Sequence, residues 1–238
     1  MVKKSVSGLS RKISNMENTV NNFELLSKAL FSNGVCDYGE FYFVQVLVRG
    51  KDGNNVNGNN KNRLVRYYVV RSAEKLMEIE PEVKELCRLH NARAYIHPTP
   101  RNDKDVASIL LKDAVKEFTD GNYHMFRRLY STACGKSFVE GKKLFIVDLD
   151  REQLGSPQLV QMGKDGDAAE CVQWAIRKCR GRGGEDADKV VARVPTKSGV
   201  HLICKPFDVG QLEGYFNLKN IPMPDVHKNN PTLLFCYK

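Results

Sequence analysis

The stretch Lys143-Leu144-Phe145-Ile146-Val147-Asp148-Leu149-Asp150 joins an apolar run to two carboxylates one residue apart. The run predicts a buried β-strand over 144–148. Because residues i and i+2 of a strand point to the same side, Asp148 and Asp150 are expected to face one spot at the end of a sheet. Two adjacent negative charges favour a cation between them, and their hard oxygens suit Mg²⁺ or Mn²⁺. The alternative, which stays open, is a turn in which Asp150 caps the next segment.

A second polar stretch lies downstream. Residues 190–194 and 200–204 are apolar runs separated by the turn Thr196-Lys197-Ser198-Gly199, which predicts a β-hairpin. His201 falls near the start of the returning strand. Lys197, the Ser198 hydroxyl and the backbone N–H groups around Gly199 suit phosphate oxygens. A purely structural role for His201 is an equally open interpretation.

Composition limits the classes of protein and partner. The chain has 238 residues, 42% hydrophobic and 27% charged, as is typical of a globular protein with a real core. Its net charge of +9, from 37 Lys+Arg against 28 Asp+Glu, favours a polyanionic partner, nucleic acid first and an anionic membrane surface second. No apolar run is long enough to span a bilayer, and no secretory signal is expected. The seven cysteines lack Cys-x-x-Cys spacing, which predicts reduced thiols of a cytoplasmic protein and no structural zinc.

The order of the predicted elements indicates an α+β protein with two modules. We expect a flexible arm over residues 1–14, an N-terminal α/β module over 15–140 and an RRM-like module over 141–238. Within the first module, strands over 41–48 and 64–70 flank a solvated loop over 50–61. The second module is expected to follow a βαββαβ order, with strands at 144–148, 190–194, 200–204 and 232–237 and helices at 168–178 and 209–216.

Further basic residues and a second histidine add candidates. Arg93 and Arg101 flank a short strand and Pro-stiffened turn, and either guanidinium can fork onto phosphate; Lys205 is a further phosphate-binding candidate. His97-Pro98-Thr99 has the His-x-Thr form used by two-histidine phosphodiesterases. That hypothesis pairs His97 with His201 across one groove, although 201–203 lacks the Thr or Ser of a second motif.

The two motifs together resemble the archaeo-eukaryotic primase superfamily. Its first motif is an apolar strand ending in Asp-x-Asp, as at residues 148–150, and its second is a Ser/Gly-rich turn ending in a strand histidine, as in Gly199-Val200-His201. The resemblance covers roughly residues 144–207. It implies nucleotidyl transfer to nucleic acid, with two divalent ions on Asp148 and Asp150, and with His201, Lys197 and Ser198 on the triphosphate of the incoming nucleotide.

The chain departs from the family pattern in one respect. Family members carry a third carboxylate at the end of a later strand, and residues 232–237 contain none. Asp208 or Asp225 is expected to substitute as the third metal ligand. The implied partners are nucleic acid, nucleoside triphosphates and a replication protein. Two rival hypotheses stay open: a non-catalytic nucleic-acid-binding protein with an RRM-like sheet, and the two-histidine phosphodiesterase.

Overall fold

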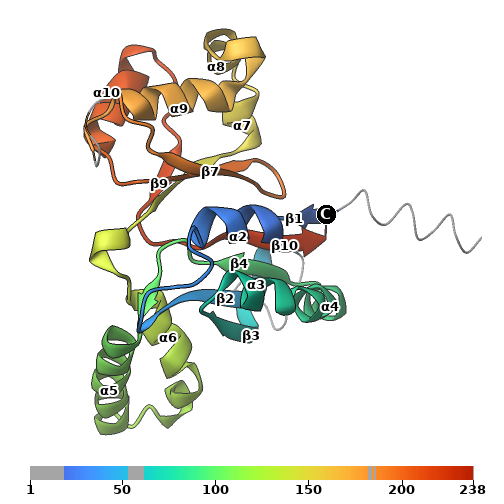
Figure 1. Cartoon of the computed structure of the whole chain (residues 1–238), viewed down its shortest axis with the longest axis vertical. Helices are drawn as coiled ribbons and strands as arrows, with labels where there is room; N and C mark the ends of the chain where they lie inside the picture. The colour runs from blue at the N-terminus through green and yellow to red at the C-terminus, as the bar shows by residue number, and fades with distance from the viewer. Residues whose placement is uncertain (1–18, 53–61, 182–183, 185, 238) are drawn as a thin grey trace, which may run out of the picture.

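The computed structural model describes residues 19–52, 62–181, 184 and 186–237, and these form a mixed α+β structure with two antiparallel sheets (Figure 1). The predicted α+β class is confirmed at this level. The expected arm over residues 1–14 and residues 53–61 of the expected loop lie outside the described residues.

The first sheet has six strands in the order β1-β10-β4-β2-β3, with the short strand β5 also paired to β2. Every pairing in it is antiparallel. Its strands are β1 (Thr19–Asn21), β2 (Glu40–Val48), β3 (Arg63–Val70), β4 (Arg93–Ile96), β5 (Arg101–Asn102) and β10 (Thr232–Tyr237), and the 3-10 turn η1 (Gly50–Asp52) follows β2. The β-branched and aromatic runs predicted as strands over 41–48 and 64–70 are confirmed, and each strand begins one residue earlier than predicted.

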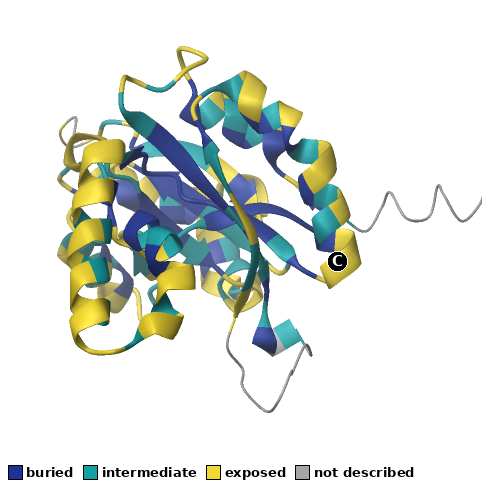
Figure 2. Ribbon diagram, turned by 90° about the horizontal axis from the view of Figure 1, so that it is seen from below, coloured by how far each residue is buried: buried dark blue, intermediate teal, exposed yellow. Residues whose placement is uncertain are grey.

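Three helices cover one face of this sheet: α2 (Phe23–Leu30), α3 (Ala73–Glu78) and α4 (Glu80–His90). Ser72 caps α3 by accepting the backbone N–H of Lys75 at 3.1 Å, and Pro81 lies in the first turn of α4, where its missing N–H costs nothing. The chain therefore forms two helices here, with Pro81 at the start of the second. Their apolar faces join the sheet in the largest core cluster. In Figure 2 the strands are mostly dark blue, whereas much of the helical surface is yellow.

A smaller cluster packs α5 (Asp103–Thr119) and α6 (Leu129–Lys136) beside Phe41 and Phe43 of the same sheet. A 3-10 segment, η2 (Tyr123–Arg128), leads into α6. Val115 of α5 is 67% exposed, because the helix contacts the sheet over a narrow stripe that includes Val106, Ile109 and Leu110.

The second sheet has four antiparallel strands in the order β7-β8-β6-β9. The strands are β6 (Phe145–Leu149), β7 (Val190–Pro195), β8 (Val200–Cys204) and β9 (Asp225–His227). The predicted hairpin over 190–204 is confirmed. Helices α9 (Ala168–Lys178) and α10 (Val209–Leu218) pack on one face, and α7 (Arg151–Leu154), α8 (Pro157–Met162), η3 (Glu140–Lys142) and η4 (Lys164–Gly166) are short connecting elements.

The last predicted strand of the βαββαβ string belongs elsewhere. Residues 232–237 form β10 between β1 and β4 in the six-stranded sheet, and β9 takes the edge position beside β6. The physical reason is that β10 is buried over 232–236, as a central strand must be, whereas β9 is a short edge strand whose Asp225 is exposed. The chain thus returns, after the four-stranded sheet, to complete the six-stranded sheet with its C-terminal strand.

The two sheets share a core through α2, which lies between them in Figure 1. Val194 of β7 and Ile203 of β8 belong to the same cluster as the α2 side chains Phe23 and Leu26. The side chain of Asn22, 2% exposed, donates to the carbonyl oxygens of Pro195 and Leu233 at 2.9 Å each. One buried amide therefore joins β7 to β10, which fixes the first sheet against the second.

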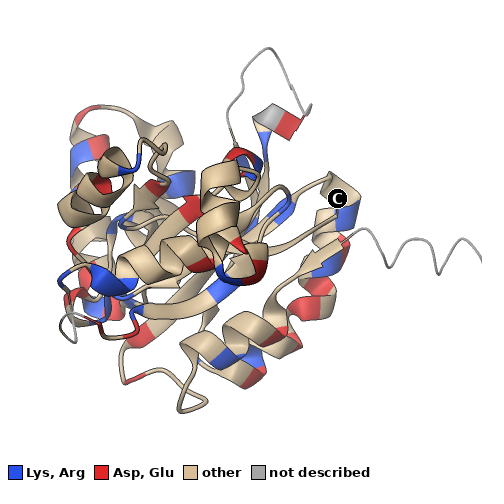
Figure 3. Ribbon diagram, turned by 90° about the horizontal axis from the view of Figure 1, so that it is seen from above, with Lys and Arg blue, Asp and Glu red and all other residues tan. Residues whose placement is uncertain are grey.

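The cysteines are unpaired and the charged side chains are mixed. All seven cysteines are free thiols, six of them buried, and burial raises the pKa of Cys87 to about 12. Lys and Arg are interspersed with Asp and Glu on the side seen in Figure 3. Among the described residues, no helix has the length and apolar character needed to cross a membrane.

Candidate active site between the two sheets

The pairing of β6 with β8 sets Asp148 directly opposite His201. Directly opposed residues of an antiparallel pair lie on the same face of a sheet. The His201 Nε2 atom lies 3.4 Å from Asp148 Oδ1, and its Nδ1 lies 2.9 Å from the hydroxyl oxygen of Thr232 in β10. The imidazole therefore touches both sheets, with its ring orientation held at both nitrogens. The predicted convergence of Asp148 and His201 is confirmed.

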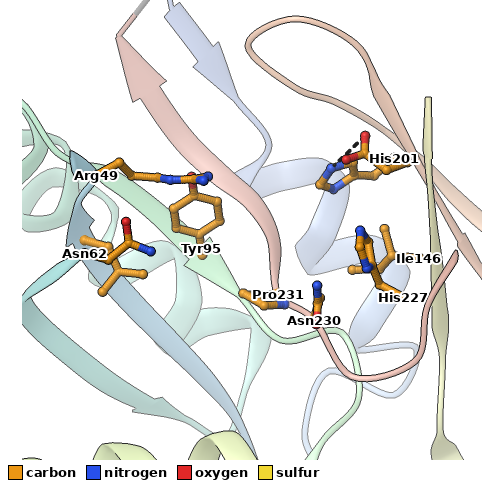
Figure 4. Close-up of a pocket in the computed structure, with 10 residues that line it drawn as sticks. Arg49, Asn62, Tyr95, Ile146, His201, His227, Asn230 and Pro231 are labelled. Carbon is orange, nitrogen blue, oxygen red and sulfur yellow. Dashed lines mark hydrogen bonds and ion pairs between the residues drawn. The ribbon is translucent and has the colours of Figure 1, made fainter. Parts of the chain in front are cut away.

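A hollow of about 390 Å³ opens beside this pair (Figure 4). In that view Arg49 and Tyr95 lie on the side of the first sheet, and His201 and His227 lie opposite them across the hollow. An adjoining hollow of about 110 Å³ shares Arg49, Tyr95, Asp148 and His201 and adds Arg93, Asp150, Thr196, Lys197, Ser198 and Leu233. We call the two hollows together the intersheet cleft. It brings together six of the residues selected from the sequence: Arg93, Asp148, Asp150, Lys197, Ser198 and His201.

Three cationic side chains line the intersheet cleft around the two acids. Arg49 follows β2 and donates from a guanidinium nitrogen to the Tyr95 hydroxyl at 2.8 Å. Arg93, on β4, is held by Asp52, with its Nε 2.7 Å from Asp52 Oδ2. Lys197 lies on the turn between β7 and β8. Fixed guanidinium groups beside a lysine favour a ligand that carries several negative oxygens, such as a polyphosphate.

Gly199 sets the position of the Lys197–Ser198 turn. A Cβ atom at Gly199 would lie 2.0 Å from the carbonyl oxygen of Leu149 and 3.2 Å from the Cα atom of Asp150. The turn therefore contacts the backbone at the end of β6 at a distance that only glycine allows. Thr196 closes the turn by donating its N–H to the carbonyl oxygen of Gly199 at 2.9 Å. The sequence selected Gly199 for phosphate binding, and the structure adds a packing requirement.

Asp150 has features of both interpretations made from the sequence. It is the N-cap residue of α7, and its backbone N–H donates to the side-chain oxygen of Gln153 at 2.9 Å. It also lines the intersheet cleft with Asp148. An N-cap position presents a carboxylate at the start of a helix, so capping and a place in the cleft are compatible.

Asp225, a candidate third ligand from the sequence, lies on β9 directly opposite Asp148. It is exposed, and its register places it on the same face as Asp148 and His201. His227, two residues further along β9, lines the cleft from that face. Three strands therefore carry His201, Asp148 and Asp225 in one row.

Asp208 and Lys205 are not brought to this row. Residue 204 pairs with residue 145, so both follow the end of β8 that is remote from Asp148, with Lys205 about 13 Å from His201 at about 3.3 Å per residue. Asp208 caps α10, accepting the N–H groups of Gly210 at 2.9 Å and Gln211 at 3.2 Å. The Asp208 carboxylate thus caps a helix at the far end of β8. This position does not support the expectation that Asp208 is a metal ligand beside Asp148.

Arg101 and His97 lie in the interior of the protein. Arg101 is 0% exposed, and its guanidinium contacts the Thr99 carbonyl oxygen at 3.1 Å and His97 Nδ1 at 2.5 Å. The prediction that Arg101 contacts phosphate is wrong, because a fully buried guanidinium cannot reach a ligand in solution. Burial lowers the pKa of Arg101 to about 10, and burial and Arg101 together lower the pKa of His97 well below its usual value. His97 packs against Phe43, with ring centroids 6.0 Å apart, and does not line the cleft, so the two-histidine hypothesis has no support.

Among the site residues that sequence reasoning missed are Arg49, Tyr95, His227 and Thr232. Arg49 directly follows β2 and Tyr95 lies on β4, whereas His227 lies on β9 and Thr232 on the C-terminal strand β10. Arg49 is the first residue after a long β-branched strand, a position at which a site residue can be suspected. Thr232 carries no local signal, because its contact with His201 spans 31 residues of chain.

Two carboxylates in one hollow fit a divalent cation in donor chemistry. Among the parts of the chain that the structure describes, no group of three or more His, Cys, Asp or Glu side chains is arranged to hold a metal ion. Two carboxylates fill only part of the coordination shell of a divalent cation, and Mg²⁺ sites in proteins commonly take their further oxygens from substrate and water.

Comparison with known proteins adds no relative. The chain matches no family model, no curated protein and no solved structure.

Proposed function

We propose that the protein is a metal-dependent nucleotidyltransferase of the primase-polymerase type, which acts on nucleic acid with nucleoside triphosphates as substrates. The observation that carries this proposal is the intersheet cleft, where Asp148, Asp150 and His201 meet Arg49, Arg93 and Lys197. Acids that can hold a cation, beside cations that can hold phosphates, are the parts that nucleotidyl transfer requires.

Asp148 and Asp150 would hold Mg²⁺ or Mn²⁺, with oxygens of substrate and water completing the coordination shell. When bound, such ions supply Lewis-acid charge neutralisation at the reacting phosphate. The carboxylates keep their place because Asp148 lies within β6 and Asp150 is the N-cap residue of α7. Preorganised charge of this kind needs no rearrangement during the reaction.

The remaining cleft residues would bind the triphosphate. Lys197 and Ser198 present an ammonium group and a hydroxyl on a turn fixed by Gly199, and Arg49 is aligned by the Tyr95 hydroxyl. His201, fixed by Thr232, presents Nε2 toward Asp148 and can donate a hydrogen bond to a phosphate oxygen. Charge-assisted hydrogen bonds are the strong ones in such a site.

The order of elements in the second sheet supports an RRM-like arrangement as part of this proposal. Along the chain β6, α9, β7, β8, α10 and β9 follow a βαββαβ order, with both helices in the core cluster on one face. The other face carries Asp148 and His201. The proposed module thus ends at β9 and excludes β10.

The non-catalytic alternative receives less support. Nucleic-acid binding by an RRM-type sheet uses exposed aromatic side chains on the central strands. Here Phe145 packs beneath the helices against Phe207, with centroids 5.8 Å apart, and Ile203 on the opposite face is buried. The open part of that face carries charged groups in place of aromatic rings.

A primer-extension assay tests the proposal. Labelled primer on a template is incubated with Mg²⁺ or Mn²⁺ and either deoxynucleoside or ribonucleoside triphosphates. We expect templated extension by the wild type and none by the double variant Asp148→Asn plus Asp150→Asn.

The matched control removes two exposed carboxylates elsewhere, Asp120→Asn plus Asp165→Asn. Asn tolerates the positive φ of 53° at residue 165, so this control should fold and keep wild-type extension. Extension that survives in the Asp148/Asp150 variant, or no extension by the wild type with either set of nucleotides, would refute the proposal.

A further inference from the structure

A second hollow lies on the outer side of α9 and α10, away from the intersheet cleft. These helices cover one face of the four-stranded sheet (Figure 1), packed on Val147 and Leu149, whereas Asp148 points to the opposite face. A hollow of about 570 Å³ opens there, lined by Trp174 and Tyr215 together with Met162, Lys164, Glu170, Cys171, Gln173, Arg177 and Lys219. We call it the outer hollow.

Two aromatic rings give the outer hollow its shape. Trp174 is the only tryptophan of the chain and is 49% exposed, although an indole is a large apolar group. The ring centroids of Trp174 and Tyr215 lie 5.7 Å apart with an interplanar angle of 55°, so the two rings form an open angle. Ring faces left open to solvent are what a flat ligand needs for stacking.

Positive charge surrounds these rings. Lys164, Arg177 and Lys219 line the outer hollow, against one carboxylate, Glu170. The Lys178 ammonium lies 5.7 Å from the Trp174 ring centroid and also pairs with Asp186. The surface therefore combines stacking faces with charges that suit phosphates, the pairing found where proteins bind single-stranded nucleic acid.

We infer that the outer hollow binds single-stranded nucleic acid, with a base stacked at Trp174 and Tyr215 and phosphates against Lys164, Arg177 and Lys219. An acidic peptide would use the same cations but has no flat ring for the exposed indole. The proposed function and this inference both have nucleic acid as the partner. Binding at the outer hollow does not depend on catalysis in the intersheet cleft, because the two lie on opposite faces of the four-stranded sheet.

The single tryptophan gives a direct measurement. Tryptophan fluorescence, excited selectively over tyrosine, is titrated without divalent metal with a single-stranded oligomer of thymidine that is about 12 nucleotides long. Because the chain has one tryptophan, the signal comes from Trp174. We expect saturable quenching whose association constant falls with salt, with a slope of log association constant against log salt concentration of about −2, for three phosphate contacts at about −0.7 each.

Two pairs of variants separate stacking from charge. Tyr215→Ala is expected to weaken binding at least about five-fold, the lower end for one stacked base, whereas Tyr215→Phe keeps the ring and the affinity. Replacing Lys164, Arg177 and Lys219 by Ala should remove most of the salt dependence. Replacing the exposed lysines of α5, Lys104, Lys112 and Lys116, should leave it unchanged.

Other ligands and the cleft variant complete the test. An oligomer of equal length without bases should quench little, and the Asp148→Asn plus Asp150→Asn variant should quench like the wild type. Quenching by thymidine oligomer with no primer extension would refute the proposed function alone. Absence of quenching, an unchanged affinity in Tyr215→Ala, or equal quenching by polyglutamate would overturn the inference, the last by assigning the surface to acidic peptides.

Discussion

Gly199→Ala tests how closely the Lys197–Ser198 turn must approach β6. The added Cβ would lie 2.0 Å from the Leu149 carbonyl oxygen, 3.0 Å from its carbonyl carbon and 3.2 Å from the Asp150 Cα atom. All three are backbone atoms, so no rotation of a side chain can relieve the overlap. Because a Cβ atom essentially never approaches another heavy atom within 3.0 Å, the turn and the end of β6 must separate by about 1 Å.

Two magnitudes follow from that displacement. Inserting a methyl group into a close contact costs about 1–3 kcal/mol in the free energy of unfolding. A displacement of about 1 Å between groups that act together costs about 100-fold in rate. We therefore expect Gly199→Ala to be less stable in urea denaturation and to extend a primer about 100-fold more slowly at a temperature at which it is fully folded.

Gly214→Ala is the matched control. Gly214 lies inside α10, its φ is not positive, and a Cβ there meets no atom within 4 Å. The same chemical change should stabilise the protein by about 0.5–1 kcal/mol, since alanine is the better helix former. If Gly199→Ala matched Gly214→Ala in both stability and extension rate, the close approach of the turn to β6 would be refuted.

Three further predictions concern single groups. Thr232→Val should lower the free energy of unfolding by about 1 kcal/mol, because it removes the hydroxyl that pairs with His201. Thr232→Ser keeps a hydroxyl and should retain most of the wild-type stability. Equal urea midpoints for the wild type, Thr232→Val and Thr232→Ser would contradict this prediction. Burial keeps the pKa of His97 well below its usual 6.5. At about pH 6 the unfolded chain therefore binds a proton at this histidine that the folded chain does not bind. The free energy of unfolding should fall as the pH drops below about 6.5, by up to about 1.4 kcal/mol per pH unit. Urea denaturation at pH 7 and pH 5.5 should therefore show a smaller loss in His97→Asn, and an undiminished loss would count against this cause. Lys197→Ala should weaken nucleotide binding about ten-fold in a calorimetric titration, whereas Lys205→Ala at the far end of β8 should not, and equal effects would contradict the placement of the cleft.

Local pattern predicted most of the elements but not their partners. The apolar run before Asp148 and the hairpin around Gly199 are confirmed because hydrophobic runs and turn residues act over a few neighbours. Residues 232–237 form a strand as predicted, but in the six-stranded sheet and not in the four-stranded one. The apolar pattern of a strand does not indicate which other strand it pairs with. β9 has three residues, too few for an alternating pattern to appear.

The same distinction applies to the candidate site. Asp148 and His201 could be predicted because both lie within recognisable motifs, and the β6–β8 register brings them together. Arg101 was selected for its charge, and its burial depends on packing around Phe41 and Cys134 that the sequence does not display. Arg49 and Thr232 join the site only through the contact between the two sheets, which involves residues remote in the chain.

Binding of Mn²⁺ measures the central claim, that the acids of the intersheet cleft hold a divalent cation. The free-ion signal in electron paramagnetic resonance is followed while protein is titrated with Mn²⁺. We predict saturable binding by the wild type and by Asp120→Asn plus Asp165→Asn, and at least about ten-fold weaker binding by Asp148→Asn plus Asp150→Asn. Equal binding by all three proteins, or none by the wild type, would contradict it.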